Sequence, residues 1–526
     1  MRILLLNLTR FGDLLQSQAA ISGLTAQGHC IGLVCLRNFA DTAALLRNVD
    51  AIFPLPGEKL LALLDHIWPK AVVELETWIK NIQTEFPFDH VCNLTPTLSA
   101  RLLGRCLAGE RPYTGFAIDP SGFGSNTGNW SGFLQGTASS RGVSPFNIVD
   151  LFRRVAGDMG TTPDASLAVP DAAAREKALA LLHSHAPEGC KGFIAVQLGA
   201  SKEHRRWPVD FFAHVGLRLW ETEQVCPVLL GTRGEARLAE EYPATAAHPC
   251  INLTGKTPLP DLAATLTVCR LLISNDTGTL HLAAGLKTPV LGIFLATAQP
   301  WDTGPYLDGC CSLEPDLPCH PCDFTQTCRH DLACARSITP EHVIALTRSF
   351  LQYRTWHAVA LPQGARVWES HLDTYGFMDL CSLSGHDREM RTMWLREQRH
   401  FYRQFFDRDN ALPFMPTNPA CPLRIPQENI VSLQGELSQI LELLDALASQ
   451  GVFLLAHPAE PASDRFLAIF RRISTTLRQS AYLGAVSMVW HEEVPNADNL
   501  AQTLHLATQY RHLLQAFHSR LSMTCP

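Results

Sequence analysis

The sequence predicts two doubly wound α/β domains followed by a mostly helical extension. Up to Leu351, short apolar runs alternate with amphipathic segments, which is the pattern of buried parallel strands joined by helices. The alternation starts afresh at Gly192–Leu198, as expected for the first strand of a second domain. Beyond Leu351 the apolar residues recur at helical spacing. We therefore expect domains at residues 1–168, 169–351 and 352–526.

The first domain begins with the apolar run Arg2–Leu8, which indicates a strand buried on both faces. A turn is expected at Thr9–Asp13, and apolar residues at helical spacing predict a helix over Leu14–Ala26. Further strands are expected at Ile31–Leu36, Val49–Pro54 and His90–Leu94. The segment Asp119–Gly142 is rich in glycine, serine and asparagine and predicts a long loop, a kind of segment that is often functional.

The second domain repeats the alternation after a helix that runs from Asp171 to about Ala186. Its strands are expected at Gly192–Leu198, Val225–Leu230, Ile251–Leu253, Cys269–Ile273 and Pro289–Phe294. In the extension, apolar stripes predict helices over Arg388–Phe406, Leu437–Leu447 (ending at Gly451) and Leu506–Phe517. The first of these interleaves arginines with aromatics, which suits an anionic membrane or acceptor, but a packed helix with a solvated face is favoured.

The composition limits the classes of function. A formal net charge of −7 and the lack of a lysine or arginine block argue against a nucleic-acid partner. The N-terminal apolar run is too short, and too interrupted by Asn7 and Arg10, to be a signal peptide. The sequence has no apolar run of about 18 residues, so no transmembrane helix is expected. We therefore expect a cytoplasmic protein whose thiols are mostly reduced. Peripheral contact with the cytoplasmic face of the inner membrane is compatible with this expectation.

The stretch Ser274–Pro289 is the most informative part of the sequence. It follows a predicted strand and continues into a predicted helix, so Asn275, Asp276, Thr277 and Gly278 fall at a strand-to-helix corner. Open parallel sheets bind ligands at such corners. Asp276 or Thr277 can cap the helix, its free N–H groups can face an anion, and Gly278 lets a phosphate approach the backbone. An ordinary capped helix explains Asp-Thr-Gly alone about equally well.

This stretch resembles the donor-binding signature of glycosyltransferase family 9, the ADP-heptose:lipopolysaccharide heptosyltransferases. Four residues match its Asp-Thr-Gly-x-x-His pattern: Asp276, Thr277, Gly278 and His281. Lys287 departs from the pattern, because the family has glycine there in Gly-x-Pro-Val. The resemblance implies two Rossmann-like domains facing one cleft, the glycosyltransferase B fold, and does not reach the extension. It also implies inverting transfer that needs no metal or other cofactor, and no Asp-x-Asp motif is placed to bind one.

The family also pairs a glycine with an aspartate after the first strand, here Gly12 and Asp13. The resemblance makes Asp13 the catalytic base that deprotonates the acceptor hydroxyl. By position alone, a helix N-cap explains Asp13 as well. The proline common six residues after this aspartate is Ala19 here, a departure that concerns helix geometry more than chemistry.

A basic loop follows the first strand of the second domain. Leu198–Pro208 resembles the family's Pro-Gly-Ala-Ser followed by Lys-x-Trp-Pro, and Arg205 stands where the family lysine contacts the donor phosphates. An arginine can grip phosphate with a bidentate fork, so Arg205 is expected to clamp the leaving diphosphate together with Ser201 and Lys202. A solvated basic loop is the alternative.

Two further segments resemble nucleotide-binding parts of the family. Glu235 lies in a Leu-x-Gly-x-x-x-Glu element, and the resemblance puts its carboxylate near the ribose hydroxyls. A glutamate placed at a helix start by the helix dipole is equally consistent with the sequence. Asn252–Thr257 also matches a family segment, and we interpret it as a loop over the nucleotide base.

A cysteine-rich segment spans residues 310–334. Four of its cysteines have a spacing suited to a tetrahedral structural metal, Zn or Fe: Cys319, Cys322, Cys328 and Cys334. His320 and His330 are spare candidate ligands. Unbound thiols or a disulfide are the slightly favoured alternative. A catalytic metal is not expected, because the segment follows the donor motif.

These features predict a glycosyltransferase that moves heptose, or a related sugar, from ADP-heptose to a lipopolysaccharide core or similar glycan. The acceptor is expected near Asp13 and Asp119–Gly142. Three alternatives stay open. They are a protein-directed (autotransporter-type) heptosyltransferase with Cys-bound iron, a nucleotide-sugar 2-epimerase, and a nucleotide-sugar-binding module without turnover.

Overall fold

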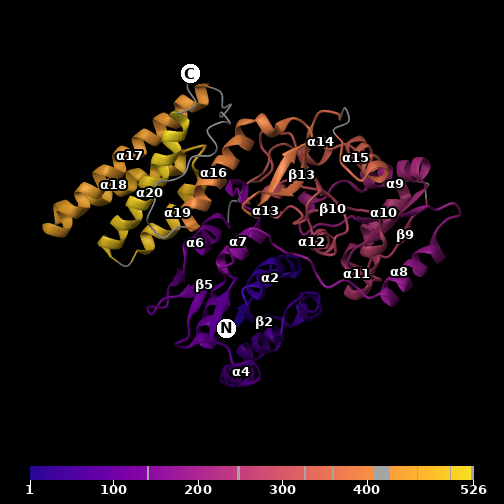
Figure 1. The fold of residues 1–526 in the computed structure, drawn as a ribbon, viewed down its shortest axis with the longest axis horizontal. Coiled ribbons are helices and arrows are strands. Elements are labelled where there is room, and N and C mark those ends of the chain that lie inside the picture. Colours follow the sequence, from indigo (N-terminus) through magenta and orange to yellow (C-terminus); the bar gives the residue numbers. More distant parts are fainter. Residues whose placement is uncertain are drawn as a thin grey trace. The chain divides into compact units, whose positions relative to one another are not determined.

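The computed structural model describes residues 1–138, 141–245, 249–324, 327–357, 361–407, 427–458, 460–497 and 499–522 (Figure 1). The chain divides into two compact units. We call residues 1–127 with 146–384 the α/β unit, and residues 128–145 with 385–526 the helical unit. The predicted class, two α/β sheets followed by a helical C-terminal region, is confirmed. The predicted boundaries at residues 168 and 351 stay a prediction, because both sheets lie within the one α/β unit.

The first sheet has six strands in the order β3-β2-β1-β4-β5-β6. They are β1 (Arg2–Leu6), β2 (Cys30–Leu36), β3 (Ala51–Leu55), β4 (His90–Asn93), β5 (Tyr113–Ile118) and β6 (Gly124–Asn126). The first five run parallel, and β6 pairs antiparallel with β5. Strand β1 is central, with Leu4 opposite Gly32 on one side and Val91 on the other. Its side chains after Arg2 are buried on both faces of the sheet, as predicted.

The helices of this half are α1 (Phe11–Gln16), α2 (Gln18–Ala26), α3 (Ala40–Ala43), α4 (Gly57–Glu85), α5 (Leu98–Ala108) and α7 (Ile148–Val155). The predicted helix over Leu14–Ala26 is in fact two helices, and the first begins earlier in the chain than predicted. Helix α1 already begins at Phe11, so the predicted turn at Thr9–Asp13 is wrong in its last residues. The break falls at Ser17, whose hydroxyl donates to the carbonyl of Leu14 at 2.7 Å.

The predicted loop over Asp119–Gly142 is also wrong. Strand β6 and helix α6 (Asn129–Thr137) lie within it. Glycine, serine and asparagine dominate this stretch, but Trp130 and Phe133 stand three residues apart and are both buried. Burial of these two aromatic side chains outweighs the low helix propensity of their neighbours. Helix α6 belongs to the helical unit.

The second sheet has eight strands in the order β14-β13-β12-β11-β10-β7-β8-β9. They are β7 (Gly192–Gln197), β8 (Val225–Leu230), β9 (Ile251–Asn252), β10 (Leu272–Asn275), β11 (Val290–Ile293), β12 (Cys311–Pro315), β13 (Ala365–Leu372) and β14 (Met378–Ser382). Strands β7 to β12 pair in parallel, while β13 and β14 add an antiparallel hairpin to β12. This hairpin falls in the range expected to be mostly helical, and the sequence analysis did not find it.

The helices of the second half are α8 (Ala172–His185), α9 (Val209–Glu223), α10 (Ala236–Thr245), α11 (Leu259–Val268), α12 (Gly278–Gly285), α13 (Pro300–Thr303), α14 (Ala333–Ser337) and α15 (Pro340–Tyr353). The core beneath them joins the strands to α9 and α15, with Trp207 and Phe212 among its fully buried side chains. Helix α12 begins directly after the central strand β10, which fixes the position of its first turn.

The helical unit contains α6, α16 (Met390–Asp407), α17 (Gln427–Ala456), α18 (Glu460–Gln479), α19 (Gly484–Glu493) and α20 (Leu500–Ser522). Helix α17 lies alongside α18 and α20 (Figure 1). The predicted end of a helix at Gly451 is wrong, because α17 continues through it. A Cβ atom at Gly451 would lie 2.9 Å from Cδ1 of Leu504, so this glycine lets α20 pack closely.

Two expectations about this unit concern membranes. Trp394 and Phe401 of α16 are buried within the unit, which supports the packed-helix interpretation of the arginine-rich segment. By length and composition, one described helix could cross a membrane: Glu428–Ala456 of α17, whose apolar 18-residue window is 33% buried. A core helix passes the same test, and Leu437 and Ile440 of this helix are fully buried.

Candidate functional site

The two strand-to-helix corners singled out from the sequence meet in the α/β unit. Helix α1 follows β1 of the first sheet, helix α12 follows β10 of the second, and the two helices pack on each other. Their first turns touch through backbone. A Cβ atom at Gly12 would lie 3.2 Å from Cα of Gly278 and 3.2 Å from Cδ2 of His281. At Gly278 it would collide with the ring of Phe11. Close approach therefore favours glycine at both positions, more strongly at Gly278, where a neighbour would have to move.

Asp13 lies in the first turn of α1 and is partly exposed. The N-cap of this helix is Arg10, so the interpretation of Asp13 as the N-cap does not hold. Below it, the fully buried Asn7 donates its side-chain amide to the Asp13 carbonyl at 3.3 Å. Asp13 therefore belongs to the helix end that faces α12.

The N-terminal end of α12 suits an anion. Its N-cap is Thr277, which makes no side-chain cap bond to the helix. The Thr277 hydroxyl instead lies 3.3 Å from the hydroxyl of Ser274. Since the N-cap side chain of Thr277 makes no bond to the helix, it does not mask the positive helix end. This geometry favours the anion-site interpretation over that of a capped helix.

Arg205 and Asp276 form the charged part of the site. Their side chains are 11% and 10% exposed, and Nη1 of Arg205 lies 3.3 Å from Oδ2 of Asp276. The Nε–H of Arg205 donates to Oγ1 of Thr297 at 2.7 Å. A guanidinium fixed in this way stands beside the N-terminal end of α12, and its positive charge adds to that of the helix end.

The rest of the basic loop is more open. Ser201 and Lys202 are exposed on the loop that leads to Arg205. The pKa of His204 is lowered, first by burial and then by the positive charges of Arg205 and Lys202. The two cations Arg205 and Lys202 themselves give this loop positive charge, as a phosphate clamp requires.

Asn275 connects the two loops and was missed as a site residue. Its side chain is fully buried, accepts from the backbone N–H of Trp207 at 2.9 Å and donates to the carbonyls of Leu198 at 2.8 Å and Gly199 at 3.2 Å. These bonds join the basic loop to the Asp276 corner. The sequence signal was its place between a strand and Asp-Thr-Gly, which does not reveal its partners.

Glu235 has two structural partners at the ends of β7 and β8. Its Oε2 accepts the backbone N–H of Thr232 at 2.7 Å and completes a capping box. The amide of Gln197 lies 3.5 Å from both carboxylate oxygens, and a Cβ atom at Gly199 would collide with Oε1. The helix-start interpretation of Glu235 therefore holds, while its contact with a ribose stays a prediction.

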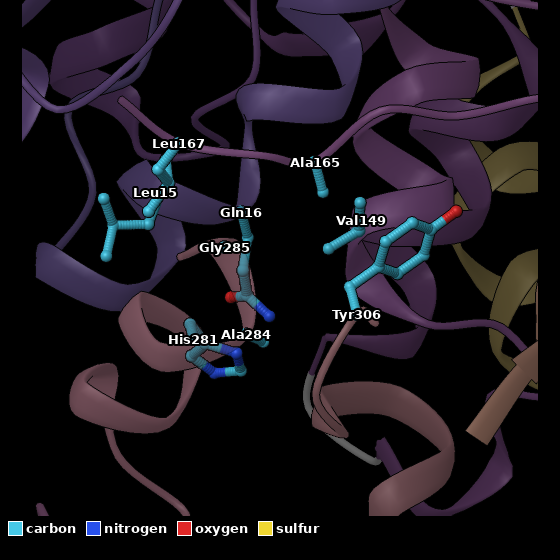
Figure 2. Close-up of a pocket in the computed structure, with 9 residues that line it drawn as sticks. All are labelled: Leu15, Gln16, Val149, Ala165, Leu167, His281, Ala284, Gly285 and Tyr306. Atoms are coloured by element: carbon cyan, nitrogen blue, oxygen red, sulfur yellow. The ribbon is translucent and has the colours of Figure 1, made fainter. Parts of the chain in front are cut away.

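His281 lies one turn into α12 and faces the first half of the α/β unit. It lines a cavity of about 20 Å³ together with residues that include Leu15, Gln16, Val149 and Tyr306 (Figure 2). Figure 2 shows the Gln16 amide beside the His281 ring, and the hydroxyl of Tyr306 turned away from the space. This cavity has room for about one water molecule and cannot hold a nucleotide sugar.

The four candidate metal-ligating cysteines are not drawn into a coordination shell. Among the described residues, the cysteine-rich segment offers no three ligand atoms within 4.8 Å of one another. All four are free thiols, with Cys319 and Cys328 exposed. The pKa of Cys322 is raised to about 11 by burial and by the neighbouring thiols of Cys334, Cys319 and Cys328. The arrangement does not fit a bound metal as it stands, and the metal site stays a prediction.

The site thus combines three groups of predicted residues. Gly12, the residue before Asp13, meets Gly278 and His281, and Arg205 meets Asp276. Two α/β sheets whose strand-to-helix corners pack together at α1 and α12 fit the class of glycosyltransferase B folds.

Comparisons with known proteins agree with this class. Residues 147–333 match the family model Glycosyltransferase family 9 (heptosyltransferase). A solved glycosyltransferase of family 9 from Veillonella parvula has the same fold, with a TM-score of 0.54 and 19% identity, covering 67% of this chain and 97% of that one. Residues 147–333 of this chain thus match glycosyltransferase family 9, and the solved relative supports the same fold.

Curated relatives match this chain at low identity and over only part of its length. Lipooligosaccharide heptosyltransferase 2 of Campylobacter jejuni is 28% identical over 172 residues, 31% of this chain and 52% of the relative. Lipopolysaccharide heptosyltransferase 1 of Pseudomonas aeruginosa is 31% identical over 130 residues, 24% of this chain and 34% of the relative. The chain spans about half the length, or less, of these relatives.

Proposed function

We propose that the protein is an inverting glycosyltransferase that moves heptose, or a related sugar, from ADP-heptose to a lipopolysaccharide core or similar glycan. The observation that carries the proposal is the contact between the first turns of α1 and α12 at Gly12 and Gly278. It puts the Asp13 helix end against the helix end that suits a diphosphate. The names of the curated relatives, lipooligosaccharide and lipopolysaccharide heptosyltransferases, support the sugar and the acceptor class.

In the proposed reaction Asp13 takes the proton of the acceptor hydroxyl. The acceptor oxygen then bonds to the anomeric carbon of the sugar while the bond from that carbon to the diphosphate oxygen breaks. A single displacement of this kind inverts the anomeric centre. The departing ADP takes the electron pair of the broken bond, and its diphosphate charge is stabilised by Arg205 and the N-terminal end of α12.

The other predicted donor contacts are assigned in the same way. We place Ser201 and Lys202 at the diphosphate and Glu235 at the ribose, with Oε1 as the accepting oxygen because Oε2 makes the capping-box bond. The clamp is cationic, so the proposed reaction needs no divalent metal to neutralise the leaving group. We propose a cytoplasmic site of action, where a nucleotide sugar is available.

The test measures ADP release from ADP-heptose with a lipopolysaccharide inner-core acceptor, in the presence of a chelator. Asp13→Asn should abolish acceptor-dependent release while donor binding persists. Asp41→Asn is the matched control, because Asp41 is an exposed carboxylate in the first turn of α3 of the same half. Full activity of Asp13→Asn, or loss of activity in chelator, would contradict the proposal. Turnover of free nucleotide sugar without acceptor would instead indicate an epimerase.

A further inference from the structure

The loop that follows β11 contacts both Arg205 and the cysteine-rich segment. Thr297 of this loop is 7% exposed, and its Oγ1 accepts the Nε–H of Arg205 at 2.7 Å. One residue earlier, the carbonyl of Ala296 accepts the backbone N–H of Cys322 at 2.8 Å. The loop therefore connects Cys322, in the middle of the cysteine-rich segment, to Arg205.

A second contact comes from the cysteine-rich segment itself. The Cζ of Arg205 lies 5.5 Å from the centroid of the Phe324 ring, within the range of a cation–π interaction. Phe324 stands two residues after Cys322 and is 47% exposed. Arg205 is thus held at three points, by Thr297 at Nε, by Asp276 at Nη1 and by Phe324 on the guanidinium.

We propose that Thr297 and Phe324 are positioning residues that fix the plane of the Arg205 guanidinium for the donor diphosphate. This inference rests on the proposed function, which assigns the diphosphate to Arg205. An ion pair with Asp276 alone leaves the long arginine side chain free to rotate about its Nη1 contact. The bond at Nε removes that rotation, so the two terminal nitrogens keep one orientation for a bidentate phosphate contact.

The inference also gives the cysteine-rich segment a role that does not depend on a metal. Through Ala296 and Phe324 the segment holds the loop and one face of the arginine in place. A side chain that acts only through Arg205 should have no effect once Arg205 is gone. A side chain that binds donor directly, or that only stabilises the fold, should keep its effect.

The test compares the binding of ADP and AMP by calorimetry, because the two differ by the phosphate that the clamp would hold. Thr297→Val should weaken ADP binding about tenfold, the usual effect of losing a hydrogen bond to a charged group, and leave AMP binding unchanged. Thr297→Ser should restore binding, and Phe324→Leu should weaken ADP binding about threefold. In Arg205→Ala, adding Thr297→Val should change nothing further.

The matched control is Thr265→Val. Thr265 is 1% exposed, and its hydroxyl donates to the Asp261 carbonyl within helix α11, so its loss should leave ADP binding as in the wild type. In turnover, Thr297→Val should lower kcat as well as raise KM for the donor, because the diphosphate charge grows in the transition state. Equal losses for ADP and AMP, or an undiminished effect of Thr297→Val without Arg205, would overturn the inference alone. A wild type that binds ADP no better than AMP would overturn the proposed function with it.

Discussion

Replacement of Gly278 by alanine tests the contact on which the site depends. In most helices a glycine-to-alanine change stabilises by about 0.5–1 kcal/mol, because the unfolded chain loses freedom and the helix gains a better former. Here the added Cβ would collide with Phe11, whose Cε1 would lie 2.8 Å away, and would lie 3.3 Å from the backbone nitrogen of Gly12. The ring or the backbone of α1 must therefore move.

The expected sign is opposite to the usual one. Overpacking of this kind costs about 1–3 kcal/mol, so a net destabilisation of about 1 kcal/mol remains after the helix gain. Scanning calorimetry should show the transition of the α/β unit lowered by about 2 °C. Gly435→Ala in α17 is the matched control, since no atom lies within 4 Å of a Cβ there, and it should show the ordinary stabilisation.

A double-mutant cycle with Phe11→Ala separates the collision from other effects. In that background Gly278→Ala should be neutral or stabilising, because the ring that it strikes is gone. ADP affinity should fall in the single variant and recover in part in the double variant. If Gly278→Ala stabilises the protein in both backgrounds as Gly435→Ala does, the close approach of α1 and α12 is refuted.

Two further predictions concern buried polar groups. Asn275→Ala should destabilise the α/β unit by about 3 kcal/mol, because it leaves the Trp207 N–H and the Leu198 carbonyl without their buried partner; a thermal shift below 1 °C would contradict this. Burial raises the pKa of Glu493, which accepts the hydroxyl of Tyr510 at 2.7 Å, from 4.5 to about 7. The folded state thus retains a proton that the unfolded state releases, so the helical unit should lose up to about 3 kcal/mol as pH rises from 4.5 to 7 and stay constant above. Glu493→Gln should flatten this part of the melting profile, and an unchanged pH dependence would show that Glu493 has the same pKa in the folded and unfolded states.

The positions of the corners could be predicted from the sequence because each follows a strong local signal. The run before Asn275 is apolar on both faces of a strand, and the helix after Thr277 starts within one residue of its predicted place. The end of the first predicted strand likewise placed Asp13 within one helical turn of the start of α1, where it lies. Local patterns carry this information because buried parallel strands leave few polar positions.

The contacts that make the site depend on residues far apart in the chain. No local pattern indicates that Gly12 lies against Gly278, or that Asn275 accepts from Trp207. The hairpin β13–β14 was missed for another reason. Strand β13 has four successive buried residues at its start, which hides the alternation typical of an antiparallel strand.

Glycine gave misleading signals in two places, because it can mark a break or a close contact. At Gly451 it was interpreted as a helix end, whereas it makes room for Leu504 of the neighbouring helix. In the stretch before Gly142 it suggested a loop, whereas Gly132 and Gly136 are part of α6. Only the packing partner distinguishes the two meanings.

The backbone contact between Gly12 and Gly278 also bears on the order of events in a catalytic cycle. A phosphate group is wider than the gap between two touching backbones, and the adjoining cavity of about 20 Å³ holds no more than about one water molecule. Under the proposed function, a donor diphosphate would reach this face of the first turn of α12 only when that turn stands away from α1. The described arrangement would then precede donor entry in the proposed cycle, and the two helix ends would have to part first.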